Sequence, residues 1–223
     1  MIRLYLIRHG QTPGNKLQRY IGTTDEPLST EGKEFLEKLT YPMPEALYVS
    51  PLCRCVETAG ILFPGKSFHI IEELSECDFG EFENKNYKEL SGNQDYQRWI
   101  DSNGTLPFPG GESREQFIRR SMEGFDRMMS DILKKSEKNT GIQNDTDPQY
   151  LNSDRGTEIP VVTIVHGGTI MAVLSSLTRG EYFDFQVKNG EGYETVLEWI
   201  QGRWKMTSLT KIGCEDSKSE HLQ

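Results

Sequence analysis

The sequence IRLYLI at residues 2–7 leads into Arg8-His9-Gly10, and VVTIV at residues 161–165 leads into His166-Gly167-Gly168. Apolar runs of this length, rich in β-branched residues, predict strands buried on both faces, as in a parallel sheet covered by helices. Such sheets bind ligands just beyond the carboxyl ends of their strands, where both histidines would lie. The glycines let backbone N–H groups approach a ligand closely. The two runs therefore predict one site that contains His9, His166 and Arg8.

The other apolar patterns predict helices that alternate with strands. Helices are expected at residues 29–39 with Ser29 as N-cap, at 52–62, at 170–177, and from a capping box at Ser113 and Gln116 to about residue 133. Strands are expected at 46–49 and 68–71, and a β-hairpin at 193–200 and 204–209. Residues 12–27 are expected to form a loop, and residues 72–111 an irregular segment with short helices at 85–90 and 95–100. This order predicts an α/β fold, a three-layer α/β/α sandwich with a mostly parallel central sheet and an added β-hairpin strand near the C-terminus.

Residues 1–210 are expected to form a single α/β domain, because no linker divides the pattern. Residues 134–159 are almost empty of apolar side chains, which predicts a polar surface insertion. Residues 211–223 are expected to be a polar tail.

Composition limits the classes of function. The chain has 223 residues and a formal net charge of −9, which argues against a nucleic-acid partner or an anionic membrane partner. No apolar stretch approaches the roughly 20 residues of a membrane span, and no export signal is visible. The four cysteines lack the spacing of a disulfide scaffold or a zinc ribbon. Cys53 and Cys55 are either a metal pair or, as we expect, two buried thiols, and the reducing cytoplasm is the expected compartment.

The residues at the predicted site suit phosphoryl chemistry. A neutral imidazole such as that of His9 is a competent nucleophile toward phosphorus, and Arg8 would neutralise phosphoryl oxygens. The alternative is a hydrogen-bonded core histidine beside a surface arginine, and this tripeptide alone does not decide between the two. Arg54 begins a helix, where an anion is favoured, although this segment by itself favours a solvated arginine paired with Glu57 or another acid. His166, before two glycines that open a helix, would stabilise a phosphoryl oxygen electrostatically, and the alternative is a structural histidine.

A general acid is expected in the acidic run that follows residue 71. A carboxyl group turned into the pocket would have its pKa raised by burial, which suits protonation of a leaving alkoxide. Most members of the run are expected to be solvated. The run alone does not select one member among Glu72, Glu73, Glu76, Asp78, Glu81 and Glu83.

These motifs, taken together, resemble the histidine phosphatase superfamily, also called phosphoglycerate-mutase-like. The matching segments occur in the family's order: Arg8-His9-Gly10 with Asn15, the loop of residues 19–29 with Gly22 and Thr23, Ser50-Pro51-Leu52-x-Arg54-x-x-x-Thr58-Ala59, Leu74-x-Glu76-x-x-x-Gly80, and His166-Gly167-Gly168. The acid motif of the family selects Glu76 from the acidic run. One departure is visible, because Phe82-Glu83-Asn84 replaces the Trp-Glu-Gly of many phosphatases, which puts the local loop shape in question.

The resemblance implies a phosphohistidine mechanism with no metal and no other cofactor. His9 would attack phosphorus and Glu76 would protonate the departing alcohol, then activate water. The implied catalytic and substrate-binding set also contains Arg8, Asn15, Gly22, Thr23, Arg54, His166 and Gly167.

The substrate is narrowed by residues 78–112, called the covering segment below. Its cations are only Lys85, Lys88 and Arg98, which favours a phosphatase over a mutase that must retain a bisphosphorylated intermediate. The sequence from Phe108 to Ser113 resembles that of alpha-ribazole phosphatases, so alpha-ribazole 5'-phosphate is a possible substrate. Aromatic residues of the segment would either stack on a flat leaving group or, for most of them, pack together: Tyr87, Tyr96, Trp99 and Phe108.

The expected partner is a small phosphorylated metabolite, bound by a monomer or a homodimer. Two alternatives remain open, a cofactor-dependent phosphoglycerate mutase and a non-catalytic module that binds a phosphorylated ligand.

Overall fold

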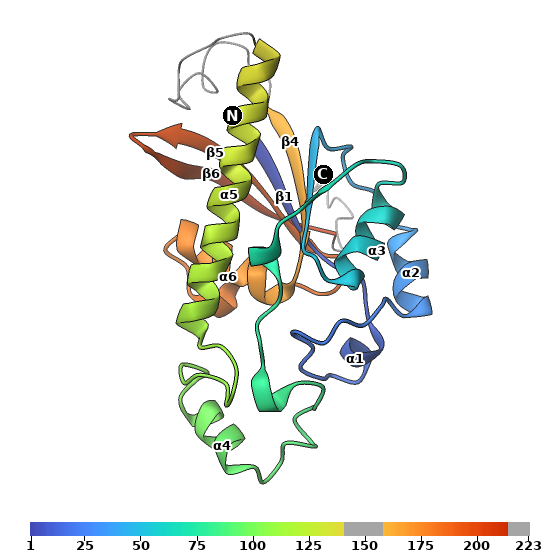
Figure 1. The fold of residues 1–223 in the computed structure, drawn as a ribbon, viewed down its shortest axis with the longest axis vertical. Coiled ribbons are helices and arrows are strands. Elements are labelled where there is room, and N and C mark those ends of the chain that lie inside the picture. The colour runs from blue at the N-terminus through green and yellow to red at the C-terminus, as the bar shows by residue number, and fades with distance from the viewer. Residues whose placement is uncertain (141–157, 214–223) are drawn as a thin grey trace, which may run out of the picture.

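A computed structural model describes residues 1–140 and 158–213, and these form a six-stranded sheet between helices (Figure 1). The strands are β1 (Ile2–Arg8), β2 (Ala46–Val49), β3 (His69–Ile70), β4 (Ile159–Val165), β5 (Gly192–Ile200) and β6 (Arg203–Ile212). Their order is β3-β2-β4-β1-β5-β6. Strands β3, β2, β4 and β1 are parallel to one another, whereas β5 pairs antiparallel with both β1 and β6. The predicted mostly parallel sheet with an added hairpin is confirmed.

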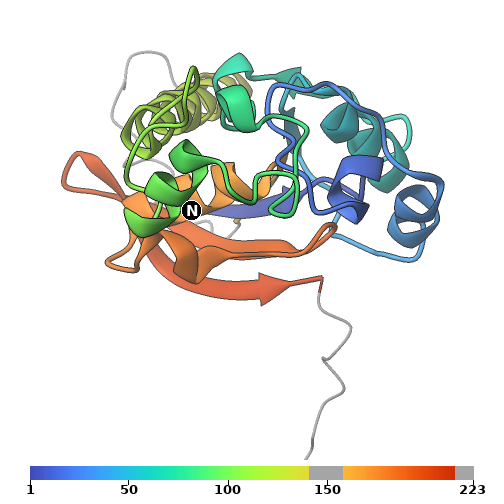
Figure 2. The same cartoon turned by 90° about the horizontal axis from the view of Figure 1, so that it is seen from below.

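Helices cover both faces of the sheet, as the two views show (Figures 1 and 2). The described α-helices are α1 (Pro13–Lys16), α2 (Thr30–Leu36), α3 (Cys53–Leu62), α4 (Gln94–Asp101), α5 (Arg114–Thr140) and α6 (Gly167–Leu177). Short 3-10 helices are η1 (Glu72–Leu74), η2 (Gly80–Phe82) and η4 (Tyr182–Phe185). Helices α5 and α6 lie on one face, and α3 with α2 lies on the other.

The alternation of side chains along β1 explains why its sequence is continuously apolar. Leu4 and Leu6 pack into the core beneath α5 and α6, together with Phe125 and Ile170. Tyr5 and Ile7 point to the opposite face, into the core that contains residues of α3. Both faces are buried from Leu4 to Ile7, which favours apolar residues there, whereas Arg3 near the start of the strand is half-buried and pairs with Glu158 and Glu194.

Two predicted helices differ from the structure. The helix expected at 29–39 begins as predicted, with Ser29 Oγ accepting a hydrogen bond from Gly32 N, but it ends at Leu36. The helix expected at 85–90 is absent and turns replace it. Asn86 Oδ1 accepts from the backbone N–H groups of Lys88 and Glu89, at 3.0 and 3.1 Å, which offers the backbone an alternative to helical hydrogen bonds.

The expected insertion and tail also change at their edges. Residues 134–140 continue α5 instead of belonging to a surface insertion, and β4 begins at Ile159. The remainder of the predicted insertion, residues 141–157, lies outside the described residues. The tail was expected from residue 211, but β6 continues to Ile212, which pairs with Gly192. Among the residues that the structure describes, no helix has both the length and the apolar character to cross a membrane.

Candidate active site

Strands β1 and β4 bring His9 and His166 together at the carboxyl edge of the sheet. The strands are parallel neighbours, and His9 N donates to Val165 O at 2.9 Å. The two imidazole centroids lie 5.1 Å apart with an angle of 63° between the rings. Both side chains are buried, with 3% and 0% of their surfaces exposed. Two segments separated by more than 150 residues therefore form one site, as the two apolar runs predict.

The hydrogen bonding of His9 determines which ring nitrogen can react. Nδ1 lies 2.7 Å from Gly10 O, and because a carbonyl oxygen only accepts, Nδ1 carries the proton. Nε2 then has a free lone pair. Burial, and next the charges of Arg54 and Arg8, hold the pKa of His9 well below its usual value. The imidazole is therefore neutral and nucleophilic at neutral pH.

Arg54 stands in the first turn of α3 and is fully buried. Its Nη1 donates to Thr24 O at 2.8 Å and its Nη2 to Gly22 O at 2.9 Å. Its Nε donates to His166 Nδ1 at 3.3 Å. The alternative of a solvated arginine paired with an acid is excluded, because Arg54 is 0% exposed and its donors bind Thr24, Gly22 and His166, while Glu57 pairs with Lys33.

His166 is the N-cap residue of α6 and is held by two neighbours. Because Arg54 donates to Nδ1, the proton of the neutral ring lies on Nε2, which donates to Ser50 Oγ at 2.7 Å. Burial is the main cause that lowers the pKa of His166 well below its usual value, and the charge of Arg54 lowers it further. Both ring nitrogens are thus engaged within the protein, so His166 gains a free N–H for a phosphoryl oxygen only by protonation or by reorienting.

Arg8 carries a buried donor without a partner. Its Nη1 donates to Val187 O at 2.8 Å, but Nε has no hydrogen-bond partner in the described part of the chain. Burial lowers the pKa of Arg8. A buried unpaired donor costs about 1–3 kcal/mol, so its retention at this edge points to an anionic ligand that would pair with it.

Glu76 faces the opening of α6. Its carboxylate accepts from Cys77 N at 2.9 Å and from Gly168 N at 3.3 Å. Burial raises the pKa of Glu76, against the lowering effect of these hydrogen bonds and of Arg54 and Arg8. The contact needs a glycine, because a Cβ atom at position 168 would lie 2.3 Å from Glu76 Oε1. A buried carboxyl with a raised pKa can serve as a proton donor.

The other predicted binding residues surround this group. Asn15 Oδ1 accepts from Asn189 Nδ2 at 2.9 Å. Gly167 packs against Arg8, whose guanidinium carbon lies 3.5 Å from the position of an added Cβ. The backbone N–H groups of Gly22 and Thr23 donate to the Glu83 carboxylate, at 3.2 and 2.9 Å. That Asn15, Gly22, Thr23 and Gly167 bind substrate stays a prediction.

Sequence reasoning missed Asn189. Its Nδ2 donates to His9 O at 3.1 Å and to Gly10 O at 3.3 Å, so this side chain holds the loop that carries the nucleophile. The only local signal is the Asn189-Gly190 pair, which marks a turn without indicating what the amide binds.

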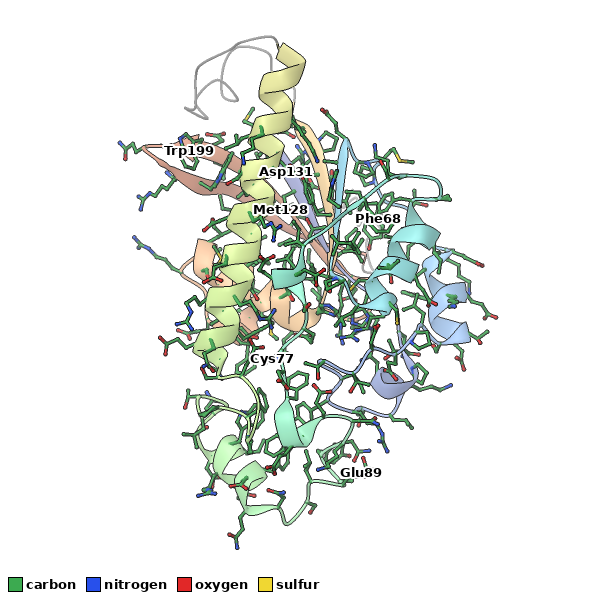
Figure 3. All side chains as sticks on the ribbon, in the orientation of Figure 1. Phe68, Cys77, Glu89, Met128, Asp131 and Trp199 are labelled. Carbon is green, nitrogen blue, oxygen red and sulfur yellow. The ribbon has the colours of Figure 1, made fainter. Side chains whose placement is uncertain are left out.

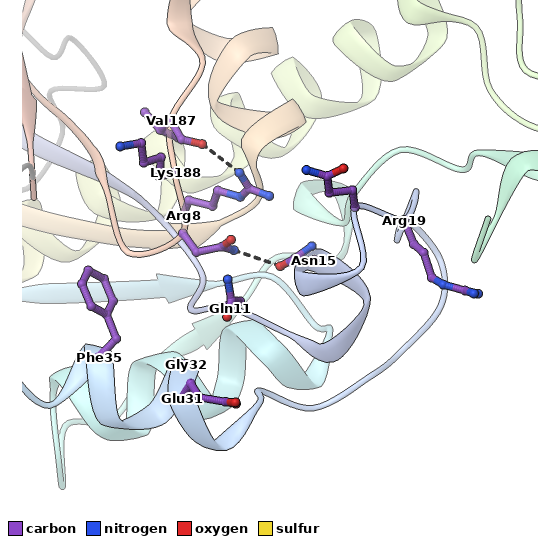
Figure 4. Close-up of a pocket in the computed structure, with 11 residues that line it drawn as sticks. Arg8, Gln11, Asn15, Arg19, Glu31, Gly32, Phe35, Val187 and Lys188 are labelled. Carbon is purple, nitrogen blue, oxygen red and sulfur yellow. Dashed lines mark hydrogen bonds between the residues drawn. The ribbon is translucent and has the colours of Figure 1, made fainter. Parts of the chain in front are cut away.

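Two cavities flank the buried group. On the side of Arg8 lies a cavity of about 670 Å³, lined also by Asn15, Arg19 and Lys188 (Figure 4). On the side of Glu76 lies a cavity of about 210 Å³ with mostly aromatic walls: Tyr20, Phe79, Trp99, Phe108, Phe117, Tyr182 and Phe183. Arg114 stands at this second cavity, over the rings of Tyr182 and Phe183. The site is therefore cationic on one side and apolar on the other.

The departure at Phe82-Glu83-Asn84 lies at the end of the 3-10 helix η2. Asn84 has a φ of 55°, in the left-handed region that asparagine tolerates better than most residues, so it can take the place of glycine. Phe82 is 1% exposed and packs in a cluster with Leu90, Phe108 and Phe117. Within residues 1–140 and 158–213, no group of three or more His, Cys, Asp or Glu side chains is placed to hold a metal ion.

The carboxyl edge of the parallel sheet thus holds two buried histidines, two arginines and one carboxylic acid. This combination is typical of the class of proteins that transfer phosphoryl groups through histidine. The chain belongs to the histidine phosphatase superfamily (branch 1), whose family model matches residues 4–140.

Relatives agree with this membership. Phosphoserine phosphatase 1 of Hydrogenobacter thermophilus is 30% identical over 133 residues, which are 56% of this chain and 63% of that protein. Glucosyl-3-phosphoglycerate phosphatase of Mycolicibacterium vanbaalenii is 29% identical over 207 residues, covering 89% of this chain and 83% of that protein. The structure of the alpha-ribazole phosphatase from Shigella flexneri has a TM-score of 0.67 at 22% identity, covering 93% and 96% of the two chains. These names support a phosphoric monoester hydrolase.

Proposed function

We propose that the chain is a metal-independent phosphomonoesterase that works through a phosphohistidine on His9. The observation that carries this proposal is the state of His9: a neutral, buried imidazole whose Nδ1 proton is held by Gly10 O, leaving the Nε2 lone pair free. Two guanidinium groups and a proton-donating carboxyl lie around it. Covalent catalysis of this kind divides one difficult displacement into two easier ones.

In the first step, His9 Nε2 forms a bond to phosphorus while the bond from phosphorus to the alcohol oxygen breaks. Glu76 gives its proton to the departing alcohol. Arg8, Arg54 and Asn15 hold the non-bridging oxygens, and their charge and hydrogen bonds stabilise the transition state. The negative phosphoryl group raises the pKa of His166 from its lowered value, so that the ring can be protonated and donate to an oxygen.

In the second step, the Glu76 carboxylate takes a proton from water. The water oxygen bonds to phosphorus as the bond from phosphorus to Nε2 breaks, which releases inorganic phosphate and restores neutral His9. Glu76 is protonated again and ready for another cycle.

The test is turnover of p-nitrophenyl phosphate in the presence of EDTA. His9→Ala is expected to lower kcat by about 10³-fold or more, because the nucleophile is lost. Denaturation at high pH during turnover is expected to trap a phosphorylated protein in the wild type and not in this variant. His69→Ala is the control, since His69 is an exposed histidine away from the site. A His9→Ala variant with wild-type turnover would contradict the proposal.

For the substrate, we propose an ester whose alcohol carries a flat apolar group, with alpha-ribazole 5'-phosphate as the leading candidate. The support is the aromatic cavity next to Glu76, the residue that would protonate the leaving alcohol. Aromatic walls favour a ring that can stack or pack edge to face. Phosphate release from a metabolite panel tests this choice, with phosphoserine and glucosyl-3-phosphoglycerate included because relatives are named for them.

The cations of the covering segment support hydrolysis over mutase activity. Lys85 Nζ donates to Glu81 O, Arg98 pairs with Asp95, and Lys88 lies over the Tyr87 ring. All three are exposed and none lines the aromatic cavity. Among the residues that the structure describes at the aromatic cavity, Arg114 is the only cation that a second phosphate of a bisphosphorylated intermediate would meet.

A further inference from the structure

Glu83 receives an unusual number of hydrogen bonds for a carboxylate outside the catalytic group. Oε1 accepts from Thr23 N at 2.9 Å and from Phe79 N at 3.2 Å. Oε2 accepts from Thr24 Oγ1 at 2.8 Å and from Gly22 N at 3.2 Å. One side chain of the covering segment thus binds three consecutive residues of the loop between α1 and α2.

The opposite side of the same loop holds Arg54. The N–H group of Gly22 and the hydroxyl of Thr24 point to Glu83, while the carbonyl oxygens of both residues accept from the Arg54 guanidinium at 2.9 and 2.8 Å. Arg54 Nε in turn donates to His166 Nδ1. A continuous path of hydrogen bonds therefore leads from Glu83 through the loop to Arg54 and His166.

Packing allows little freedom in this arrangement. A Cβ atom at position 22 would lie 2.3 Å from Glu83 Oε1 and 1.9 Å from Cys77 O, so only glycine fits between the loop and the covering segment. Beside it, Asn84 N donates to Tyr20 O at 2.8 Å and Tyr20 N donates to Lys85 O at 2.9 Å. The loop is thus joined to the covering segment from Tyr20 to Thr24 through the hydrogen bonds of Glu83 and its neighbours.

We propose that Glu83 is a positioning residue that sets the guanidinium of Arg54 against the transferring phosphoryl group. This role rests on the proposed function. Glu83 would act on the transition state through the carbonyl oxygens of Gly22 and Thr24. Small displacements of a charged group at a reacting centre are costly, since misplacement by about 1 Å can lower a rate about 100-fold. Glu83 would also connect the covering segment, which faces the leaving group, to the residues that hold the phosphoryl group.

Glu83→Gln is the sharpest substitution, because the shape is kept and only one acceptor oxygen remains. Each carboxylate oxygen of Glu83 accepts two hydrogen bonds, and an NH₂ group cannot accept any. Whichever oxygen is replaced, two of the four hydrogen bonds are therefore lost. Glu81→Gln is the matched control: it makes the same chemical change two residues earlier, inside the 3-10 helix η2 that Glu83 caps, on an exposed side chain.

The first readout is kinetic. With p-nitrophenyl phosphate, Glu83→Gln is expected to lower kcat by about 10- to 100-fold and to change KM by less than about threefold. Inhibition by orthovanadate, which imitates five-coordinate phosphorus, is expected to weaken in proportion to kcat/KM. The thermal midpoint should stay within about 4 °C of that of Glu81→Gln. A kcat equal to that of the control overturns the proposal, as does a loss of stability with no selective effect on kcat.

The second readout does not depend on turnover. The imidazole ¹⁵N resonances of His166 report whether Arg54 still donates to Nδ1, and tungstate affinity reports the anion site. We expect both to change in Glu83→Gln and neither in Glu81→Gln. Unchanged resonances and affinity overturn the role of Glu83. If the wild type binds tungstate but hydrolyses no ester, the proposed function is overturned. The role of Glu83 is then still tested, because the ¹⁵N resonances of His166 report its coupling to Glu83 without turnover.

Discussion

The sheet edge and the covering segment build the site in opposite ways. At the sheet edge, Arg8 ends β1, His9 follows it, Arg54 lies in the first turn of α3, and His166 caps α6. The covering segment holds one α-helix of eight residues, α4, and the rings that form its cluster come from residues 20 to 108: Tyr20, Phe79, Phe82, Tyr96, Trp99 and Phe108. The regular edge supplies groups for the phosphoryl centre, and the irregular segment supplies walls for the rest of the substrate.

This difference has a physical origin. At a strand-to-helix junction, backbone hydrogen bonds fix the main chain, and so each side chain there has a well-defined position. Aromatic clusters position side chains by packing, and they tolerate exchanges of similar volume. The chemistry should therefore be sensitive to single changes at the edge, whereas changes in the cavity walls should alter only which esters bind well.

Glu76, where the two regions meet, gives the largest effect expected in this comparison. Glu76→Gln is expected to lower kcat/KM, which reports the steps up to release of the alcohol, by about 10²- to 10⁴-fold for alkyl phosphates, whose leaving groups need a proton. For p-nitrophenyl phosphate the loss in kcat/KM should be much smaller, because nitrophenolate leaves without a proton. Its kcat can still fall, because Glu76 also activates water in the second step. Parallel assays of both esters measure the ratio of the two losses, and equal losses in kcat/KM would contradict the role of Glu76 as the acid.

The pH profile follows from the same groups. Burial lowers the pKa of His9 and raises that of Glu76. Activity should fall at low pH as His9 becomes protonated, below its usual pKa of about 6.5. It should also fall as pH rises through the raised pKa of Glu76, and Glu76→Gln should lose that upper limb. A carboxyl with a raised pKa stabilises the fold below its unfolded value and loses that contribution as pH rises through the folded one. The Gln variant should therefore unfold no earlier than the wild type at neutral pH.

A wall of the aromatic cavity should give a smaller effect that depends on the substrate. Phe183 lines the cavity, is 43% exposed, and lies 4.8 Å from the Arg114 guanidinium. Phe183→Ala is expected to raise KM for 1-naphthyl phosphate by about 3- to 10-fold through the loss of an aromatic contact. KM for ethyl phosphate and both kcat values should stay near those of the wild type.

Phe68→Ala is the control for this prediction. Phe68 is also exposed, at 36%, and lies near β3 and α3, away from Cys77 beside the site (Figure 3). Two outcomes would show that the cavity does not recognise the leaving group. One is an equal rise in KM for both esters in Phe183→Ala, and the other is a rise in KM for 1-naphthyl phosphate in Phe68→Ala as large as that in Phe183→Ala.

The sequence predicts the edge far better than the segment that covers it. His9 and His166 follow continuous apolar runs, and Arg54 follows a strand and a proline, so short patterns are enough to place them. Nothing comparable places Glu83 or Asn189. The amide of Asn189 bonds to His9 O across 180 positions of the chain, and such a contact has no local sequence signature.

The same reasoning explains the errors at 85–90 and in residues 134–140. At 85–90, the helical pattern competes with a side chain, Asn86, that satisfies the backbone N–H groups in another way. Residues 134–140 lack the apolar periodicity that marks the earlier part of α5, and polarity alone does not distinguish such a helix end from a loop.

The smallest effect is expected at Asn84, where the two regions are joined but no substrate contact is made. Its φ of 55° favours glycine, whereas Asn84 Oδ1 accepts from Arg19 Nη1 at 3.1 Å. Asn84→Gly relieves the left-handed backbone, but it loses this exposed hydrogen bond and gives the unfolded chain more entropy. We expect these changes to cancel to within about 0.5 kcal/mol in the free energy of unfolding.

Asn84→Ala has no such compensation and should destabilise the protein by about 1 kcal/mol. Urea unfolding measures both, and an alanine variant as stable as the wild type would show that the backbone conformation does not select asparagine here. Since Asn84 adjoins Glu83 without holding it, kcat should be unchanged in the glycine variant, which separates the shape of this loop from the hydrogen bonds that Glu83 makes.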